Sequence, residues 1–569
     1  MYNIERVIFA LKNTILEAFK NLVESGTLQG EINENFAIEI PADREHGDLS
    51  SNAAFIMAKN FKMPPRKIAD LVVDFLVSDD DFKNKKIVSK VEVAGAGFMN
   101  FFLDSAFFSG TLREIQNLKE HYGESEYGKN KKIMVEFVSA NPTGPMHMGN
   151  ARLGALGDCL ASILKKTGYD VFKEFYVNDA GNQIEKFGLS LDARYLQICK
   201  GEPFGPIPED CYQGEDITEL AKEFFDVYGS KYLNSPFEER KQVLVHFALP
   251  KNIARMQRDM EKYKIIYDNW FYESVLHESG EVNKIINLLS ENGYTYQKDG
   301  CLWYKATEFG SEKDEVLVRK NGIPTYFAAD IAYHYNKFIT RKFDICIDIW
   351  GADHHGHVER MKGSMEALGI NRERLHVILV QLVRLLKNGE IVRMSKRTGK
   401  AVQLSDLIDE VGADAARFIF NTHESNSGMD FDLDLAVKQD AQNPVYYVQY
   451  AYARVCSIFR QIKSLNKGFN LENNVNLDLL TSESERKLIF FMATYPMELL
   501  ESSINYDPTK ITRYVISLAT LFHKFYSSCK VISENDDLTN ARLCLCSCVK
   551  ILIKSILDMF KIDAPEVMN

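Results

Sequence analysis

One stretch constrains the fold more than any other: an apolar run, KIMVEFV, leads through SANPTGPMHMG into a segment rich in small residues. The run predicts a buried strand at residues 133–138, and the segment after the turn predicts a helix at 150–166. A second strand follows in GYDVFKEFYVND. Because strands joined by a helical crossover run parallel, the chain must contain a parallel sheet.

The patterns on either side divide the 569 residues into three units. Residues 1–122 combine helices with alternating strands and predict an N-terminal α+β domain. Residues 123–433 hold the parallel α/β sheet, and a charged helical stretch at about 200–285 is typical of an insertion. Residues 434–569 contain amphipathic helices without a convincing strand, which predicts an all-α C-terminal domain.

Composition excludes some classes of protein. A formal net charge of −11 argues against a general nucleic-acid coat, although a local basic groove remains compatible with it. No uncharged apolar run reaches membrane-spanning length, and the first helix is amphipathic rather than a signal peptide. The ten cysteines lack CxxC spacing. Cys544, Cys546 and Cys548 fit a helical core better than a metal site, so a cytoplasmic location is expected.

The turn after the first parallel strand lies where α/β sheets bind ligands. Pro142 stiffens it, and Gly144 and Gly149 allow a ligand to approach the backbone. His147 can donate a hydrogen bond to a phosphate oxygen. A tight structural turn with an incidental surface histidine explains the same residues equally well.

The longer stretch VEFVSANPTGPMHMGNARLGALGD resembles the HIGH signature of class I aminoacyl-tRNA synthetases, in the form typical of arginyl-tRNA synthetases. Asn150 stands where the family usually has a second histidine. Its amide can donate a hydrogen bond but carries no charge. The resemblance implies a Rossmann-like catalytic domain that binds ATP, with catalytic roles for His147 and Asn150, and Pro142, Gly144 and Gly149 also at the ATP.

A second stretch, NGEIVRMSKRTGKAVQLSDLIDEV, resembles the KMSKS loop of the same class. Met394, Ser395 and Lys396 match the motif, whereas Arg393 and Arg397 replace its first and last residues. The resemblance places all three matching residues at the ATP and gives Lys396 a catalytic role. It also implies Mg²⁺ that arrives with ATP, without a metal site of the protein's own. A solvated basic hairpin is the alternative.

The segment NGIPTYFAADIAYHYNKF places Tyr326 and Asp330 four residues apart, on one face of a predicted helix. A guanidinium favours carboxylates that it can bind in planar geometry. In arginyl-tRNA synthetases the matching residues line the arginine pocket. The same resemblance assigns Glu136 and Asn141 to the α-amino end of arginine, and YDNWFYES offers Glu273 as a second carboxylate.

A metalloenzyme is a competing hypothesis. WGADHHGHVERMK gathers Asp353, His354, His355 and His357, which are suitable ligands for zinc or manganese. The DHH triplet also resembles manganese phosphoesterases, but the other aspartate motifs of that family are missing. Because the preceding strand ends at the same sheet edge as the HIGH-like turn, His354 is assigned to ATP instead.

Two further segments point to RNA. EHGDLSSNAAF and GAGFMNFFL resemble the N-terminal domain of arginyl-tRNA synthetases, which touches the corner of the tRNA, and the C-terminal helices resemble their anticodon-binding domain. There Tyr446 and Tyr450 can stack on unpaired bases, while Arg454 binds phosphate. Tyrosines that merely complete a helical core are the alternative for each position.

The patterns together predict an arginine–tRNA ligase that activates L-arginine with ATP and transfers it to tRNA(Arg). The expectation is a monomer without membrane contact, and the resemblance further implies that tRNA binds before arginine is activated. A small-molecule adenylyltransferase would share the turn but would not need the helical C-terminus. An RNA-binding module without catalysis is the other alternative, and Asn150 is the residue that favours it.

Overall fold

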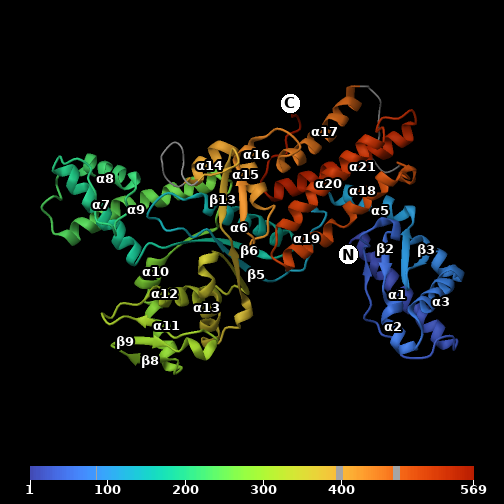
Figure 1. The fold of residues 1–569 in the computed structure, drawn as a ribbon, viewed down its shortest axis with the longest axis horizontal. Coiled ribbons are helices and arrows are strands. Elements are labelled where there is room, and N and C mark those ends of the chain that lie inside the picture. The colour runs from blue at the N-terminus through green and yellow to red at the C-terminus, as the bar shows by residue number, and fades with distance from the viewer. Residues whose placement is uncertain (85, 393–401, 465–474, 569) are drawn as a thin grey trace.

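The computed structural model describes residues 1–568 apart from 85, 393–401 and 465–474. Figure 1 shows the central sheet with the helices α7, α8 and α9 extending at one end of the long axis. The N-terminal domain and the C-terminal helices lie at the opposite end. The mixed α/β fold with a parallel sheet is therefore as predicted.

The N-terminal domain is built on a four-stranded antiparallel sheet with the order β1-β2-β4-β3. In β4 the alternate residues Met99, Phe101 and Leu103 are buried, as a period-two pattern predicts, but Asn100 between them is buried as well. The strands are β1 (Ile38–Glu39), β2 (Leu49–Ser51), β3 (Val88–Ala94) and β4 (Phe98–Leu103). The helices are α1 (Asn3–Glu24), α2 (Ala53–Phe61), α3 (Pro65–Ser78), α4 (Asp80–Asn84) and α5 (Ser105–Leu118).

The central sheet has five parallel strands in the order β12-β11-β5-β6-β7. They are β5 (Lys132–Phe137), β6 (Asp170–Val177), β7 (Asn269–Tyr272), β11 (Ile345–Gly351) and β12 (Leu375–Val380). Helix α6 (Met148–Lys166) follows β5, and α13 (His355–Ala367) follows β11. The chain leaves β5 toward β6 on one side and returns to β11 on the other, so the order of the strands reverses at β5.

The segment predicted as an insertion is organised differently from the expectation. Helices α7 (Asn182–Cys199), α8 (Glu215–Tyr228) and α9 (Phe237–Lys262) pack around a core of their own. However, β7 lies within residues 200–285 and is an edge strand of the central sheet. Its four residues, NWFY, are too few to show a strand period, so only its pairing with β6 reveals it.

Two small sheets flank the central one. The first has the order β10-β9-β8, with β8 (Thr295–Lys298), β9 (Cys301–Tyr304) and β10 (Glu315–Val318). The second has the order β14-β13-β15, with β13 (Val383–Lys387), β14 (Glu390–Val392) and β15 (Met429–Asp432). Before the first small sheet come α10 (Glu273–Glu278) and α11 (Glu281–Glu291), and α12 (Tyr326–Tyr335) follows it. In the second, α14 (Leu404–Val411) and α15 (Ala413–Phe420) lie between β14 and β15, and α16 (Leu433–Val437) follows β15.

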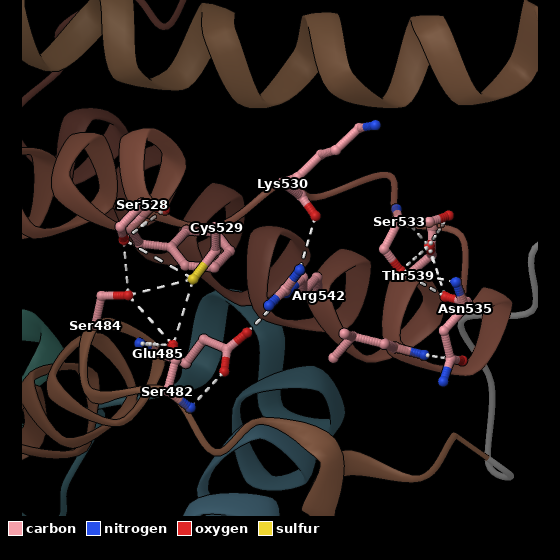
Figure 2. A network of polar contacts seen from close by, with 12 residues as sticks. Ser482, Ser484, Glu485, Ser528, Cys529, Lys530, Ser533, Asn535, Thr539 and Arg542 are labelled. Carbon is pink, nitrogen blue, oxygen red and sulfur yellow. Dashed lines mark hydrogen bonds and ion pairs between the residues drawn. The ribbon is translucent and has the colours of Figure 1, made fainter.

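From α17 onward the described residues are helical and include no strand. The helices are α17 (Pro444–Ser464), α18 (Glu483–Ala493), α19 (Tyr495–Ile504), α20 (Thr509–Ser528) and α21 (Asp536–Met559). Cys544, Cys546 and Cys548 are buried in α21. Arg542 of α21 donates to the Glu485 carboxylate of α18 at 2.7 Å and to the Lys530 carbonyl at 2.8 Å. Figure 2 shows both hydrogen bonds. These contacts tie α18 and α21 to the loop that follows α20, at one end of the bundle.

The N-terminal domain is attached to the C-terminal helices through α5. The rings of Phe107 and Phe490 lie 5.9 Å apart, and Ser109 Oγ donates to Asp478 at 2.7 Å. The rings of Tyr122 and Tyr495 stack at 6.2 Å just beyond α5. Among the described helices, none is long and apolar enough to cross a membrane.

Candidate active site

A cavity of about 1060 Å³ opens at the carboxyl ends of β5 and β11. These two strands are neighbours at the point where the strand order reverses, which is where open α/β sheets bind ligands. The turn before α6 and the turn before α13 both face this cavity. Most of the residues predicted for the site line it: Glu136, Asn141, Gly144, His147, Asn150, Glu273, Tyr326, Asp330 and His354.

His147 and Asn150 cap the first turn of α6 reciprocally. The N–H of Gly149 donates to His147 Nδ1 at 3.1 Å, and the N–H of His147 donates to Asn150 Oδ1 at 2.9 Å. With Nδ1 accepting, the proton of the neutral ring is on Nε2, and desolvation lowers the pKa of His147. Within the described chain the Asn150 amide nitrogen has no partner, so both side chains retain a donor for a ligand.

Two other residues of the turn, Pro142 and Gly149, do not line the cavity but contribute to the structure of the turn. Pro142 is buried, and its carbonyl accepts from Asn252 Nδ2 of α9 at 3.0 Å. A Cβ at Gly149 would lie 2.9 Å from Cε1 of His147, so any larger residue would displace the imidazole. Neither Pro142 nor Gly149 is among the residues that line the cavity, whereas Gly144 is.

The lysine loop predicted at Met394, Ser395 and Lys396 lies outside the described residues. The chain that follows it is described and pairs with the turn before α6. Met148 N–H donates to the Val402 carbonyl at 3.0 Å, and Leu404 N–H donates to the Met146 carbonyl at 2.9 Å. The two signatures, about 250 residues apart in the sequence, are therefore joined by backbone hydrogen bonds.

Two carboxylates that face the cavity have no lysine or arginine partner in the described part of the chain. Asp330 of α12 and Glu273 of α10 are 6% and 3% exposed. Asp330 Oδ2 lies 3.0 Å from His357 Nε2, and Glu273 Oε1 lies 3.4 Å from His277 Nε2. No Lys or Arg among the described residues forms an ion pair with either. This half of the cavity therefore has a negative charge for a ligand to neutralise.

The pKa values of Tyr326 and Glu273 are both raised, as a negative charge at this end of the cavity requires. The negative charge of Asp330, with desolvation, raises the pKa of Tyr326 well above its ordinary value. Burial raises the pKa of Glu273, and the nearby Asp330 carboxylate adds to this rise. Tyr326 thus keeps its proton as a donor, and a cation between the two acids would be stabilised by both.

Glu136, at the end of β5, is in a different electrostatic state. Lys337 Nζ lies 2.5 Å from one of its oxygens, and Ser139 Oγ donates to the other at 2.8 Å. Lys337 is fully buried and also contacts Asp348 at 2.7 Å, while His334 contacts Asp348 at 2.6 Å. Lys337 therefore gives Glu136 a cationic partner, which it shares with Asp348, and Ser139 helps to orient the Glu136 carboxylate before any ligand arrives. Burial, together with the nearby charge of Asp348, raises the pKa of Glu136.

Lys337 is a residue that the sequence reading missed. It follows Asp330 by seven residues and lies in the π-helical turn Asn336–Thr340 that continues α12, so the spacing from Asp330 was the only local signal for it. Asp179, just beyond β6, was also missed. It accepts from the N–H and the hydroxyl of Ser274 at 2.9 and 2.7 Å and so fixes the start of α10, where Glu273 lies.

The Asp and His side chains after β11 are not brought together in the described structure as the metal-site hypothesis requires. His354 lines the cavity, but His357 binds Asp330, and His355 is not among the lining residues. The described part of the chain holds no group of three His, Cys, Asp or Glu side chains that could bind a metal. The rings of His354 and His357 lie 6.1 and 5.5 Å from Trp350 instead. Trp350, the penultimate residue of β11, is a further lining residue that the sequence reading did not identify.

The predicted RNA-facing residues of α17 form a row. Tyr446 and Tyr450 stack with centroids 6.2 Å apart and planes at 8°. The Arg454 guanidinium lies 4.7 Å from the centroid of Tyr450 and 5.0 Å from that of Tyr526 on α20. Tyr452 points into the core and is 3% exposed.

Comparisons with known proteins cover the chain from end to end. The family described as "tRNA synthetases class I (R), catalytic domain" matches residues 111–455. "Arginyl tRNA synthetase N terminal domain" matches 10–103, and "DALR anticodon binding domain" matches 448–568.

Curated relatives and solved structures agree with these matches. The chain is 52% identical over 558 residues to an arginine–tRNA ligase of Ruminiclostridium cellulolyticum, covering 98% of both chains. It is 50% identical to one of Acetivibrio thermocellus, covering 99% of this chain and all of the relative. The arginyl-tRNA synthetase structure of Thermus thermophilus superposes with a TM-score of 0.73 at 21% identity, over 99% of this chain and all of that one.

Proposed function

Because the chain belongs to the arginyl-tRNA synthetase family of class I, we propose how its cavity carries out the arginine–tRNA ligase reaction. The enzyme charges tRNA(Arg) with arginine and uses ATP as a substrate. The proposal divides the cavity into an arginine end, between α10 and α12, and an ATP end, between the turns before α6 and α13. The 1–122, 123–433 and 434–569 units are proposed to act as tRNA-corner, catalytic and anticodon domains.

The assignment of arginine to this end of the cavity rests on one observation. The buried carboxylates Asp330 and Glu273 have no Lys or Arg partner in the described chain. A guanidinium supplies planar donors and a permanent charge, so it neutralises both acids at once. Citrulline has the same shape without the charge and would leave the acids unpaired. The neutral Tyr326 hydroxyl is proposed to donate alongside them.

The α-amino end of arginine is proposed to lie against Glu136 and Asn141, at the end of β5. Lys337 and Ser139 hold the Glu136 carboxylate in one orientation. Since Glu136 already has a cationic partner in Lys337, it would position the α-ammonium group more than it attracts arginine from solution. Such positioning aims the α-carboxylate of arginine at the ATP end.

At the ATP end, an oxygen of the arginine α-carboxylate attacks the α-phosphorus, and the bond from that phosphorus to the pyrophosphate oxygen breaks. His147 Nε2–H, the Asn150 amide and the Lys396 ammonium are proposed to stabilise the charge that develops on the phosphate oxygens. Gly144, His354, Met394 and Ser395 are proposed to complete the ATP site. Mg²⁺ is proposed to enter with ATP and balance its charge.

In the second step, the terminal 2′-hydroxyl of tRNA attacks the carbonyl carbon of arginyl-adenylate and AMP leaves. Tyr446, Tyr450 and Arg454 are proposed to hold anticodon-loop bases, since stacked rings beside a guanidinium suit unpaired bases. We further propose a cytoplasmic monomer that binds tRNA before it activates arginine. The ten cysteines, none of them in a disulfide, support a reducing compartment.

ATP–pyrophosphate exchange tests this assignment in one assay. Exchange is expected only when arginine and tRNA are both present, with lysine and citrulline inactive. Exchange without tRNA would contradict the proposed order of binding. Exchange with citrulline would contradict the role of the unpaired carboxylates.

A further inference from the structure

After α21 the chain turns back to the catalytic domain. The Phe560 carbonyl accepts from Arg417 Nε of α15 at 2.8 Å, and Lys561 Nζ lies 2.9 Å from Asp158 Oδ1. Asp563 N–H donates to Asp414 at 2.9 Å. We call residues 560–566 the C-terminal segment. It contacts α6 and α15 of the catalytic domain as well as the helical domain.

Asp158 is the centre of these contacts and belongs to α6, the helix that begins at the His147 turn. It is fully buried and contacts three cations: Arg417 at 2.6 Å, and Lys173 and Lys561 at 2.9 Å each. Burial alone would raise the pKa of Asp158, but these cations lower it to about 2. Along the helix axis, Asp158 lies about 16 Å from His147.

The other end of the C-terminal segment is held by α17. Gln449 Nε2 donates to the Asp563 carbonyl at 2.8 Å, and Arg460 donates to the Glu566 carbonyl at 2.8 Å. Gln449 is the neighbour of Tyr450 in the proposed RNA-facing row. One short segment thus contacts both the helix proposed to bind the anticodon and the helix that begins at the ATP site.

We infer that the C-terminal segment positions α6 in response to tRNA, with Lys561 and Asp158 as the contact that sets the place of His147 and Asn150. This inference depends on the proposed tRNA contact at α17. Lys561 suits the role because its side chain is 33% exposed, whereas Arg417 is fully buried. If Lys561 moves away, Asp158 keeps two cations, so the contact can form and break without leaving a buried charge unpaired.

Lys561→Met in the full-length enzyme tests the inference. Its matched control is Lys554→Met, which removes an exposed α21 lysine paired only with Asp558 among the described residues. At saturating tRNA, Lys561→Met should lower kcat for pyrophosphate exchange at least about fivefold, the lower bound for coupled sites. The dissociation constant for tRNA should change much less than kcat. Lys561→Arg should restore kcat, and Gln449→Ala should lower it by disrupting the other end of the segment.

Three results would overturn the inference. One is a kcat for Lys561→Met equal to that for Lys554→Met. Another is a fall in tRNA affinity as large as the fall in kcat, because the residue would then bind tRNA or maintain the fold. The third is full activity in Gln449→Ala. Unchanged tRNA affinity in Tyr450→Ala would instead contradict the proposed RNA contact and remove the α17 end of the inference with it.

Discussion

Replacing Asp330 by Asn removes one negative charge from the arginine end and keeps the size of the side chain. The Asn oxygen can still accept from His357 Nε2, which lies 3.0 Å from Asp330 Oδ2. The change therefore isolates the charge that a guanidinium would meet. Hydrogen bonds to charged groups are worth about 1.5–3 kcal/mol, and 1.4 kcal/mol corresponds to a tenfold change, so KM for arginine should rise about 10- to 150-fold.

The assay is steady-state aminoacylation with arginine and ATP varied in turn. KM for ATP should change less than about twofold, because interactions made only with arginine contribute nothing to ATP binding. Asp353→Asn is the matched control. Asp353 also lines the cavity, but it lies in the turn before α13 and its side chain is exposed. This variant should leave KM for arginine unchanged.

Glu273→Gln should reproduce the effect of Asp330→Asn, and the double variant shows whether the two acids bind one cation. If they do, the combined loss differs from the sum of the single losses. An equal rise in both KM values, or a rise for arginine below threefold, would refute the assignment of the unpaired carboxylates to the guanidinium.

Three other variants test the remaining parts of the site. His147→Ala should lower pyrophosphate exchange about 100- to 1000-fold, the usual effect of removing one donor to developing charge, while tRNA affinity measured by filter binding stays unchanged. In Asp158→Asn, the melting temperature should fall less steeply between pH 4 and 2 than it does in the wild type. The pKa of Asp158 is lowered from 3.8 to about 2, so the wild-type stabilisation is complete above pH 3.8 and is lost as pH falls toward 2. A melting temperature that still falls as steeply between pH 4 and 2 would contradict this. Tyr450→Ala should weaken tRNA binding by about 1–3 kcal/mol, the value of one stacked base, whereas Tyr450→Phe should not.

The turn before α6 illustrates what local sequence can and cannot predict. The apolar run, the turn residues and the small-residue helix are local signals, and they place His147 and Asn150 correctly at the start of a helix. The sequence did not reveal the reciprocal cap between them, because Asn150 was interpreted only as a substitution for the second histidine of the signature. In the structure its oxygen caps His147, and its nitrogen remains available to a ligand.

The arginine end shows the same division. The spacing of Tyr326 and Asp330 is a property of one helix, so the sequence predicts that they share a face. The electrostatic difference between the acids is not local. Glu136 has a lysine partner because β5 and β11 pair in a register that sets it beside Asp348, with Lys337 between the two acids. Asp330 and Glu273 have no such partner in the described chain.

By itself, the sequence determined the parallel sheet, the place of the ligand turn, the two signatures and the all-helical C-terminus. Each of these depends on residues close together in the chain, whose periodicity and turn chemistry act locally. Only the tertiary structure decided which acids have no lysine or arginine partner in the described chain, that β7 joins the central sheet, and that residues 560–566 return to Asp158. Those features depend on charges and backbone groups brought together from distant segments, and pairwise contacts of that kind leave no periodic trace in a single sequence.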